Sequence, residues 1–580
     1  MMTPSKYALV LAIGLAWPAT RAGAAAQEQP PTPPPVEETG PPPVSLSLAD
    51  AIQMSLKNNL DIKIAKVTPQ IREQDEAFQE AAFDPNLGFS ATYQDNSRPS
   101  SNVFDVGAQG TLVSIDSKVQ NYQAGISDRF RYGASYSANL DLTSFTSNSA
   151  NAVFPTTYQA SLDFVYNQSL LRNRGREVNE TQIVIAQNNQ AIGKSQFRQQ
   201  VLDTLKATED AYWELVFARQ NLDVSKEALG LAGELLKLNK IKVQVGTLPP
   251  IEITQADAEV ASREQGVIVA ENAVSDAEDN LRRVMNMPKD GGSWDKPIAP
   301  SDEPLYVERP VDLPRELETA VSHRPDLEQA RLNTKTSDSR LAFDRNQLKW
   351  DLGLRATYTL AGLAGDSGDF LTRVATACAD DGVDGIPATG DPGEGDGICE
   401  GAQPATGSNP AGPGETLTFG NLLLAQGADQ GFADALKNIT GGDFPSWSVS
   451  LFLGIPLGNR SAEASYSGSR LAKEQSEIRY ENALLNAEVQ VRTAARAIVT
   501  GKKRIDAAEK NVELQRKKVE AEQKKFENGM STSFQVLTFQ NDLITALGTK
   551  NRALVDYRKA LSALEQAKGT LDDYLKVNVQ

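Results

Sequence analysis

Two long stretches without proline, Val178–Gly246 and Ser461–Gly529, constrain the fold more than any other feature. Large residues, mostly apolar, recur every seven positions in both: Val201, Thr208, Leu215, Leu222, Leu229, Leu236 and Val243 in the first, and Leu484, Val491, Ile498, Ile505, Val512, Val519 and Phe526 in the second. Three positions after each comes mostly a small residue, such as Ala211 or Ala487. A seven-residue repeat is typical of helices that supercoil around one another. We therefore predict two very long helices packed closely side by side.

The chain reads as an internal duplication. The two heptad registers and the terminal glycines Gly246 and Gly529 are offset by the same 283 residues. Each half is expected to contain a helix, strands, a very long helix, a tight turn and a last helix. The expected boundaries are residues 46–286 for the first repeat, 287–314 for a connector and 315–580 for the second repeat, which includes a loop rich in glycine and aspartate at 361–443.

The N-terminus carries export signals. Residues 1–26 combine Lys6, a short apolar run and small residues around Ala24, as in a secretory signal peptide. Residues 27–45 are rich in proline and are expected to form an extended tether. Loss of the signal would change the formal charge from −17 to −19, because Lys6 and Arg21 leave with it. Such an acidic chain argues against nucleic acid as a partner.

Strict alternation of apolar and polar residues predicts β-strands in both halves. The clearest four are Leu87–Gln94, Tyr158–Gln168, Leu352–Leu360 and Trp447–Leu457. A soluble sandwich would also alternate, but aromatic residues near the strand ends favour a membrane barrel. Four strands cannot close a barrel, so we expect the chain to share one with copies of itself. A further hairpin, Asn121–Ser127 with Gly133–Phe145, either joins this barrel or stands apart from it.

The loop of the second half contains the only two cysteines, Cys378 and Cys399, for which a disulfide is expected in an exported protein. Between them Asp380, Asp384 and Asp391 loosely match the spacing of a calcium loop. Gly382 occupies a position where a ligand is required, so a solvated acidic loop is the alternative and no metal site is assigned.

From Leu46 to about Leu575 the chain resembles the TolC-type outer-membrane efflux proteins. The resemblance rests on the duplication, on the order of strands and long helices, and on two turn motifs. These motifs are the segments 246–253 (GTLPPIEI) and 529–536 (GMSTSFQV). It implies a homotrimer in the outer membrane of a Gram-negative bacterium, with a twelve-stranded barrel in the lipid continuing into a periplasmic α-helical barrel. It also implies docking to a periplasmic adaptor and an inner-membrane transporter.

The resemblance places the gate and the partner contacts at the tip formed by the two turns. The residues that we assign to it are Gly246, Glu252, Asp257, Phe526, Gly529 and Gln535. Well-known members carry acidic residues in the second turn, where this chain has Gln535 and Thr538, and a basic latch residue where it has Ser531. Glu252 and Asp257 either attract cations at the tip or simply face solvent.

We therefore expect a passive exit duct for efflux or type I secretion. No motif resembles a phosphate-binding loop, a nucleophile elbow or a paired-histidine metal site, so we expect neither an enzyme nor a cofactor. Two alternatives are a periplasmic coiled-coil spacer without channel activity and a secreted hydrolase with a helical stalk. The cargo stays open between small toxic compounds, metal ions and polypeptides.

Overall fold

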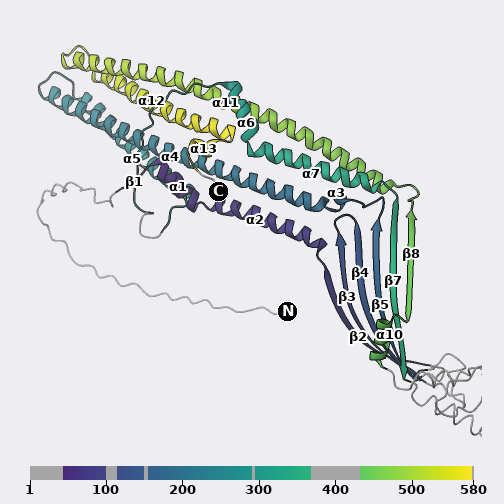
Figure 1. The fold of residues 1–580 in the computed structure, drawn as a ribbon. Helices are drawn as coiled ribbons and strands as arrows, with labels where there is room; N and C mark the ends of the chain where they lie inside the picture. The colour runs from purple at the N-terminus through teal and green to yellow at the C-terminus, as the bar shows by residue number, and fades with distance from the viewer. Residues whose placement is uncertain (1–42, 100–113, 149–153, 290–293, 367–430, 578–580) are drawn as a thin grey trace, which may run out of the picture.

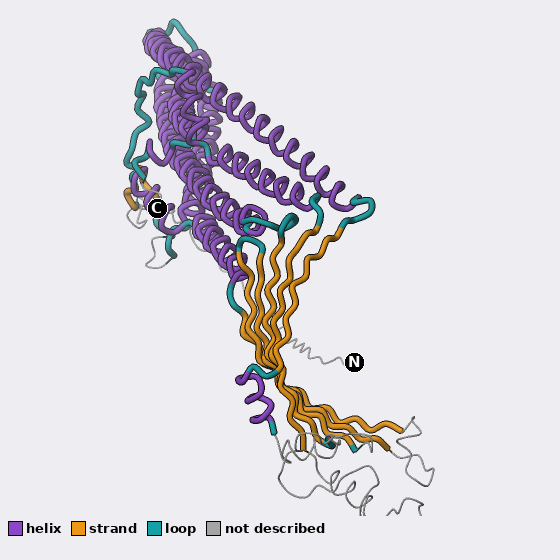
Figure 2. The backbone as a smooth tube through the Cα atoms, turned by 45° about the vertical axis from the view of Figure 1, so that its right-hand side comes forward, coloured by secondary structure: helices purple, strands orange, loops and turns teal. Residues whose placement is uncertain are grey.

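The computed structural model describes residues 43–99, 114–148, 154–289, 294–366 and 431–577. It is a long molecule, with a layer of helices at one end and an extended sheet at the other (Figure 1). The turns at residues 245–250 and 528–532, which follow the two long helices, lie at the end of the helical layer farthest from the sheet (Figure 1). Figure 2 shows the strands continuing the helical layer rather than packing on it. The predicted order of strands, long helices and tip is thus confirmed.

The elements of the first half are β1 Val44–Leu46, α1 Leu48–Asn58, α2 Leu60–Glu80, the 3₁₀ turn η1 Ala81–Phe83, β2 Asn86–Pro99, β3 Ser114–Phe130, β4 Ala134–Ser147, β5 Thr156–Ser169, α3 Arg176–Asn179, α4 Thr181–Gln244 and α5 Ile251–Met285. Those of the second half are β6 Ile298–Pro300, α6 Leu313–His323, α7 Pro325–Gln347, β7 Asp351–Asp366, α10 Phe432–Gly441, β8 Phe444–Gly454, α11 Arg460–Glu527, α12 Ser533–Lys568 and α13 Leu571–Tyr574.

The two long helices agree with their heptad patterns. α4 has 64 residues and α11 has 68, so each is about 100 Å long at about 1.5 Å per residue. On α11 every heptad position from Val491 to Phe526 is buried. The small positions let helices approach: a Cβ at Gly501 would lie 3.1 Å from the Tyr557 ring on α12. In the part of the chain that the structure describes, no helix is both long and apolar enough to cross a membrane.

The shorter helices lie end to end along the long ones, as their lengths predicted. α4 packs against α5 near the tip and against α2 near the sheet, while α11 packs against α12 and then α7 (Figure 1). Contacts of α4 with α12 and α7 join the two halves. The layer therefore runs α5–α4–α12–α11 in the tip half and α2–α4–α7–α11 in the sheet half, with a free edge on each side.

A compact belt, formed by β1, β6 and the residues packed on them, crosses the middle of the helical layer. The structure shows here that the predicted end of the tether at residue 45 is wrong. Val44–Leu46 is a strand parallel to Ile298–Pro300, rather than the end of a tether followed by helix. Leu46 is buried with Tyr212 and Trp213 of α4. A three-residue strand carries no periodic signal, and its partner lies far along the chain, so the sequence pattern could not reveal it. The first half has a break between α1 and α2. The second half has a similar break between α6 and α7, because Pro325 starts a new helix.

Six antiparallel strands form one sheet in the order β2-β3-β4-β5-β7-β8. The hairpin that the sequence left open is β3–β4, and it lies inside the sheet between β2 and β5. The strands are longer than the sequence suggested: β3 has 17 residues and β7 has 16. Only part of each strand shows alternating apolar and polar residues. The sequence pattern therefore predicts shorter strands, which end where the residues on the apolar face become polar.

The prediction of a loop over the whole of 361–443 is also wrong at both ends. β7 continues to Asp366, and α10 packs on β5 and β7. Ala435 and Ile439 of α10 are buried against Ala160 and Ala364 of the sheet. Gly362 makes this approach feasible, since a Cβ there would collide with the Ala435 carbonyl oxygen. Short elements of this kind were hidden in a segment whose composition is dominated by glycine and aspartate.

Candidate functional site

Each tip turn is a left-handed glycine cap of the preceding long helix. Gly246 has φ +77° and Gly529 has φ +74°. The amide of Thr247 donates to the Lys242 carbonyl at 2.9 Å, and the amide of Met530 donates to the Lys525 carbonyl at the same distance. These are the 6→1 bonds of a Schellman motif, in which glycine is favoured because it adopts positive φ without a Cβ penalty. The predicted glycine turns are thus structurally equivalent.

Two contacts tie the first turn to the second. The Ser533 hydroxyl at the start of α12 donates to the Glu252 carboxylate at the start of α5. The Lys242 ammonium donates to the Phe526 carbonyl at 2.5 Å and lies 3.9 Å from the centroid of the Phe526 ring. The structure therefore places Glu252 and Phe526 in contact with the opposite hairpin, whereas Gly246 and Gly529 shape the two turns. The two helical hairpins are held to each other at their ends.

The other two assigned residues stay on the surface. Asp257 pairs with Lys240 at 3.8 Å, with both side chains about half exposed, so this contact lies within the α4–α5 hairpin. Gln535 is exposed, and its backbone amide donates to the Thr532 hydroxyl that caps α12. Neither residue reaches the opposite hairpin.

Ser531, which replaces the family's basic latch residue, binds inside its own hairpin. Its hydroxyl donates to Glu522 at 2.5 Å, and Lys525 contacts the same carboxylate at 3.0 Å. The Ser531 hydrogen bond, and then Lys525, lower the pKa of Glu522, so this carboxylate is anionic at neutral pH. The charge is compensated locally and does not reach across the tip.

Lys242 and Ser533 carry the polar contacts between the hairpins, beside a buried apolar cluster of Leu235, Phe526 and Val536. The sequence analysis assigned neither Lys242 nor Ser533 to the tip. The signal for Lys242 was present, because it is offset by 283 residues from Lys525 and each precedes its tip glycine by four positions. Nothing in the sequence marks Ser533, since only the fold places it opposite Glu252.

The sheet has one apolar and one polar face. Along the register, residues on one face of all six strands form continuous apolar rows, such as Leu87–Ile126–Ala138–Phe164–Tyr358–Trp447. Most apolar stretches run for about seven to nine residues, which spans about 18–23 Å at about 3.3 Å per residue and about 40° tilt. The apolar band of outer-membrane barrels is about 25 Å tall. Aromatic residues lie near both limits of the band: Phe130, Tyr132, Tyr136 and Tyr166 at the helical end, and Tyr93, Tyr122, Tyr158 and Phe432 at the far end.

The opposite face is polar and concave. A hollow of about 520 Å³ is lined by Ser90, Gln123, Asn139 and Asp141 among others. Beside this hollow, Asp163, the register partner of Asn139, accepts hydrogen bonds from Ser161 and Thr359. A concave hydrophilic face behind an apolar band is what the wall of a water-filled passage requires.

One buried carboxylate in the middle belt gives a testable pH dependence. Burial raises the pKa of Glu209 to about 7, although Trp213 donates to it at 3.3 Å and Lys206 and Ser562 favour its charged form. Because the folded pKa lies above the unfolded value, the contribution of Glu209 to stability is most favourable below about pH 4.5. It falls by about 3 kcal/mol as pH rises toward 7, at 1.36 kcal/mol per pH unit. We expect Glu209→Gln to raise the melting temperature of the purified protein at pH 8 and to leave it unchanged at pH 4.5.

Glu234→Gln, on an exposed position of the same helix, should change neither melting temperature. Equal melting temperatures of Glu209→Gln and the wild type at pH 8 would contradict this assignment.

The proposed disulfide Cys378–Cys399 and the weak calcium candidates Asp380, Asp384 and Asp391 lie outside the described residues. Residues 1–42, which include the expected signal peptide and most of the tether, also lie outside them.

A sheet with an apolar band and a concave polar face, continued by helices about 100 Å long, defines the class of outer-membrane channels with a periplasmic helical extension. The family model described as outer membrane efflux protein matches residues 51–287 and 423–570. The chain therefore belongs to the outer membrane efflux protein family. Its place is the outer membrane of a Gram-negative bacterium, from which it extends into the periplasm, and its family consists of efflux channels rather than enzymes.

Solved structures share the fold at low sequence identity. The Campylobacter jejuni CmeC outer membrane channel is 14% identical, with a TM-score of 0.57 over 90% of this chain and 85% of that one. The outer-membrane channel OprN is 13% identical, with a TM-score of 0.59 over 90% of each chain. The Vibrio cholerae outer membrane protein VceC is 13% identical, with a TM-score of 0.57 over 90% of this chain and 96% of that one. No curated protein sequence matches the chain significantly.

Proposed function

We propose that three copies of this chain close into a single passive exit duct, which conducts cargo from an inner-membrane transporter through the periplasm to the outside. One observation carries the proposal: in the single chain, the sheet and the helical layer each have two free edges, and these edges fit one another. The number three is what the family resemblance implies. Each copy would contribute two equivalent helical hairpins, as the expected internal duplication predicts.

The free edges of the sheet are β2 and β8. Six alternating strands leave these two antiparallel, so β8 of one copy can pair with β2 of the next. Their side chains are exposed in the single chain, with Leu87 81% and Trp447 74% accessible. Unpaired strand edges are not tolerated in lipid, because backbone groups there have no water to bind. Closure with further copies satisfies them.

The free edges of the helical layer carry matching apolar stripes near the sheet. On α2 the stripe consists of Leu60, Ile64, Val67, Ile71 and Phe78, all exposed by 47% or more. On α11 it consists of Leu471, Ile478 and Leu485, which are spaced by seven and are at least 58% exposed. Stripes with coiled-coil spacing on opposite edges of one layer are what a ring of helices requires.

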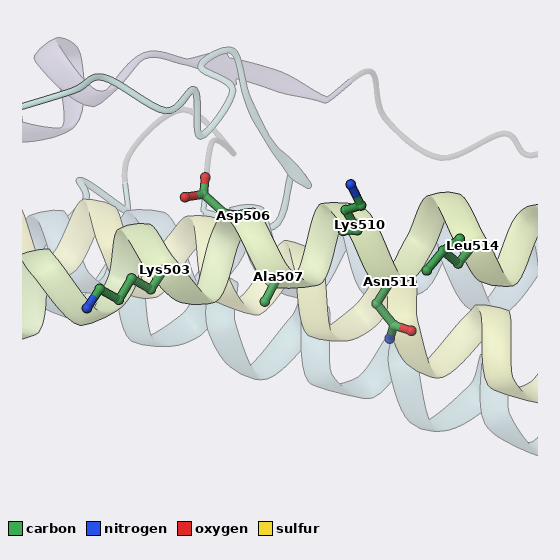
Figure 3. Close-up of a pocket in the computed structure, with 6 residues that line it drawn as sticks. All are labelled: Lys503, Asp506, Ala507, Lys510, Asn511 and Leu514. Atoms are coloured by element: carbon green, nitrogen blue, oxygen red, sulfur yellow. The ribbon is translucent and has the colours of Figure 1, made fainter.

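In the tip half the two edges have complementary charge. α5 carries eight acidic and three basic residues, whereas the segment Lys502–Lys525 of α11 carries nine basic and five acidic residues. The exposed face of α11 also holds a shallow groove of about 610 Å³ between Lys503 and Leu514 (Figure 3). Opposite charges along facing edges favour association and fix its register. The acidic α5 of a neighbouring copy is the occupant that we propose for this groove.

The tip offers an apolar rim for a periplasmic adaptor. Val245 and Ile251 of the first turn and Met530 and Phe534 of the second are each 58–71% exposed. Exposed apolar side chains concentrated on two neighbouring turns mark an interaction site. We propose that an adaptor binds this rim and links the duct to its transporter, which supplies the energy.

Conductance of the purified protein in planar bilayers tests the proposal. We expect small channels from the wild type, because the contacts between the hairpins hold the tip closed. The double substitution Lys242→Met with Ser533→Ala removes the contacts to Phe526 and Glu252. It should raise the conductance or the open fraction several-fold.

The matched control is Lys240→Met, which removes an ion pair within one hairpin and should leave the conductance unchanged. The absence of any channel from the wild type and from the double variant would support the coiled-coil spacer instead. Deletion of the gene identifies the class of cargo. Greater sensitivity to toxic compounds, greater sensitivity to metals and loss of a secreted polypeptide are three separable outcomes.

A further inference from the structure

We propose that the outer-membrane section of this protein is an eighteen-stranded barrel, as wide as the helical duct that it continues, rather than the twelve-stranded barrel that the family resemblance implies. The proposal rests on the three-copy duct argued above and adds to it the number of strands that each copy contributes.

The β3–β4 hairpin is an integral part of the wall. β3 pairs with β2 from Ser127 to Ser114 without a break, and β4 pairs with β5 from Ala134 to Thr146. If the hairpin stood outside the sheet, β2 and β5 would lose these partners. β2 and β5 would then need new hydrogen-bonding partners, because lipid offers none to their backbone groups.

From Tyr122 to Ile126 of β3 and from Tyr136 to Leu142 of β4, the side chains of the hairpin follow the same division as the other strands. Its apolar positions Tyr122, Ala124, Leu140 and Leu142 lie in the rows that form the apolar band. The intervening positions are hydrophilic or glycine, and they line the concave face together with Ser90 of β2. An appendage in water would have no reason to continue both faces of a membrane wall.

The width of six strands equals the width of the helical layer. A strand spaced at about 4.8 Å and tilted by about 40° occupies about 6 Å of a barrel's circumference, so six occupy about 37 Å. The four helices α2, α4, α7 and α11 occupy about 36–40 Å at interaxial distances of about 9–10 Å. Four strands would cover only about 25 Å, and the wall would have to taper sharply where the helices begin.

The consequence concerns the width of cargo. Three copies of six strands give a backbone diameter of about 36 Å, compared with about 24 Å for twelve strands. Once inward side chains of about 5 Å are subtracted on each side, the barrel wall leaves about 26 Å rather than about 14 Å. We infer that the wall in the membrane is not the narrowest part of the duct, so the width limit on the cargo is set at the helical tip.

Electron cryomicroscopy of the full-length protein in lipid nanodiscs tests the proposal directly. We expect rings of eighteen strands, about 36 Å across. Deletion of the hairpin, residues 114–147, should give twelve strands and a diameter of about 24 Å. Three copies with twelve wall strands and the hairpin outside would overturn the proposal and leave the exit duct intact. Any other number of copies, with six wall strands in each, would overturn the three-copy duct but not the hairpin assignment.

Disulfide trapping in cells provides a second measurement that does not depend on the deletion variant. In a background of Cys378→Ser and Cys399→Ser, paired cysteines at Ser90 and Gln123, or at Asp141 and Ser161, should cross-link because these residues are register partners. Cysteines at Ser90 and Ser161 should not, since β3 and β4 separate them. Cross-linking of Ser90 to Ser161 with loss of the other two would show β2 next to β5 and contradict the eighteen-stranded wall.

Discussion

Substituting Ile64 and Ile71 with glutamate is expected to convert the assembled protein into single chains. Both residues belong to the exposed stripe of α2, at 68% and 56% accessibility. In the proposed ring they would face α11 of the next copy. Burial of an unpaired carboxylate costs several kcal/mol, so two per interface should weaken association by about a thousand-fold or more. Light scattering of the detergent-solubilised protein measures the loss.

The matched control places the same charges on the same helix, seven residues apart, but off the stripe. Gln70→Glu with Ala77→Glu uses two exposed positions of α2, and the assembly should persist. If the Ile64 and Ile71 variant kept the wild-type mass, α2 would not lie at the subunit interface.

A second large effect is expected from arginine at Val449, which lies on the apolar face of β8 and is 61% exposed. Arginine on the lipid-facing side of a barrel strand costs up to about 2–4 kcal/mol, depending on its depth in the bilayer, and every copy in the proposed ring would carry it. We expect Val449→Arg to abolish the outer-membrane form, as measured by the amount of assembled protein in isolated outer membranes.

The neighbouring residue provides the control. Ser448 lies on the polar face, where its hydroxyl is 2.7 Å from that of Thr357, so Ser448→Arg should assemble close to normally. Equal loss in both variants would mean that β8 does not separate lipid from water in the way that the register indicates.

The long helices could be predicted because the same signal repeats along more than sixty residues. Heptad spacing, absence of proline and a terminal glycine all point to one structure, and α11 ends at Glu527, next to the predicted boundary. The strand number could not be settled in this way. β3 alternates clearly only from Tyr122 to Ile126, since its remaining outward residues include Lys118, Gln120 and Asp128. Pairing with β2 and β4, rather than its own pattern, keeps it in the sheet.

The tip was predictable in its backbone but not in its side chains. A glycine after a long helix predicts a left-handed cap, and Gly246 and Gly529 both adopt it. The contact between Glu252 and Ser533 joins residues 281 positions apart, and no local pattern encodes such a distance. The 283-residue offset between the two halves carries more information, because it pairs Lys242 with Lys525 and so marks a position that the turn motifs do not include.

The mass of the particle extracted from the outer membrane shows whether the chains form a three-copy ring. Light scattering, corrected for bound detergent, should give three chains for the wild type, which is the number that the family resemblance implies. In such a ring the sheet edges β2 and β8 and the helical edges α2, α5 and α11 are all covered. A stable particle containing one chain would contradict the account, since these edges would have to remain open in lipid and in water.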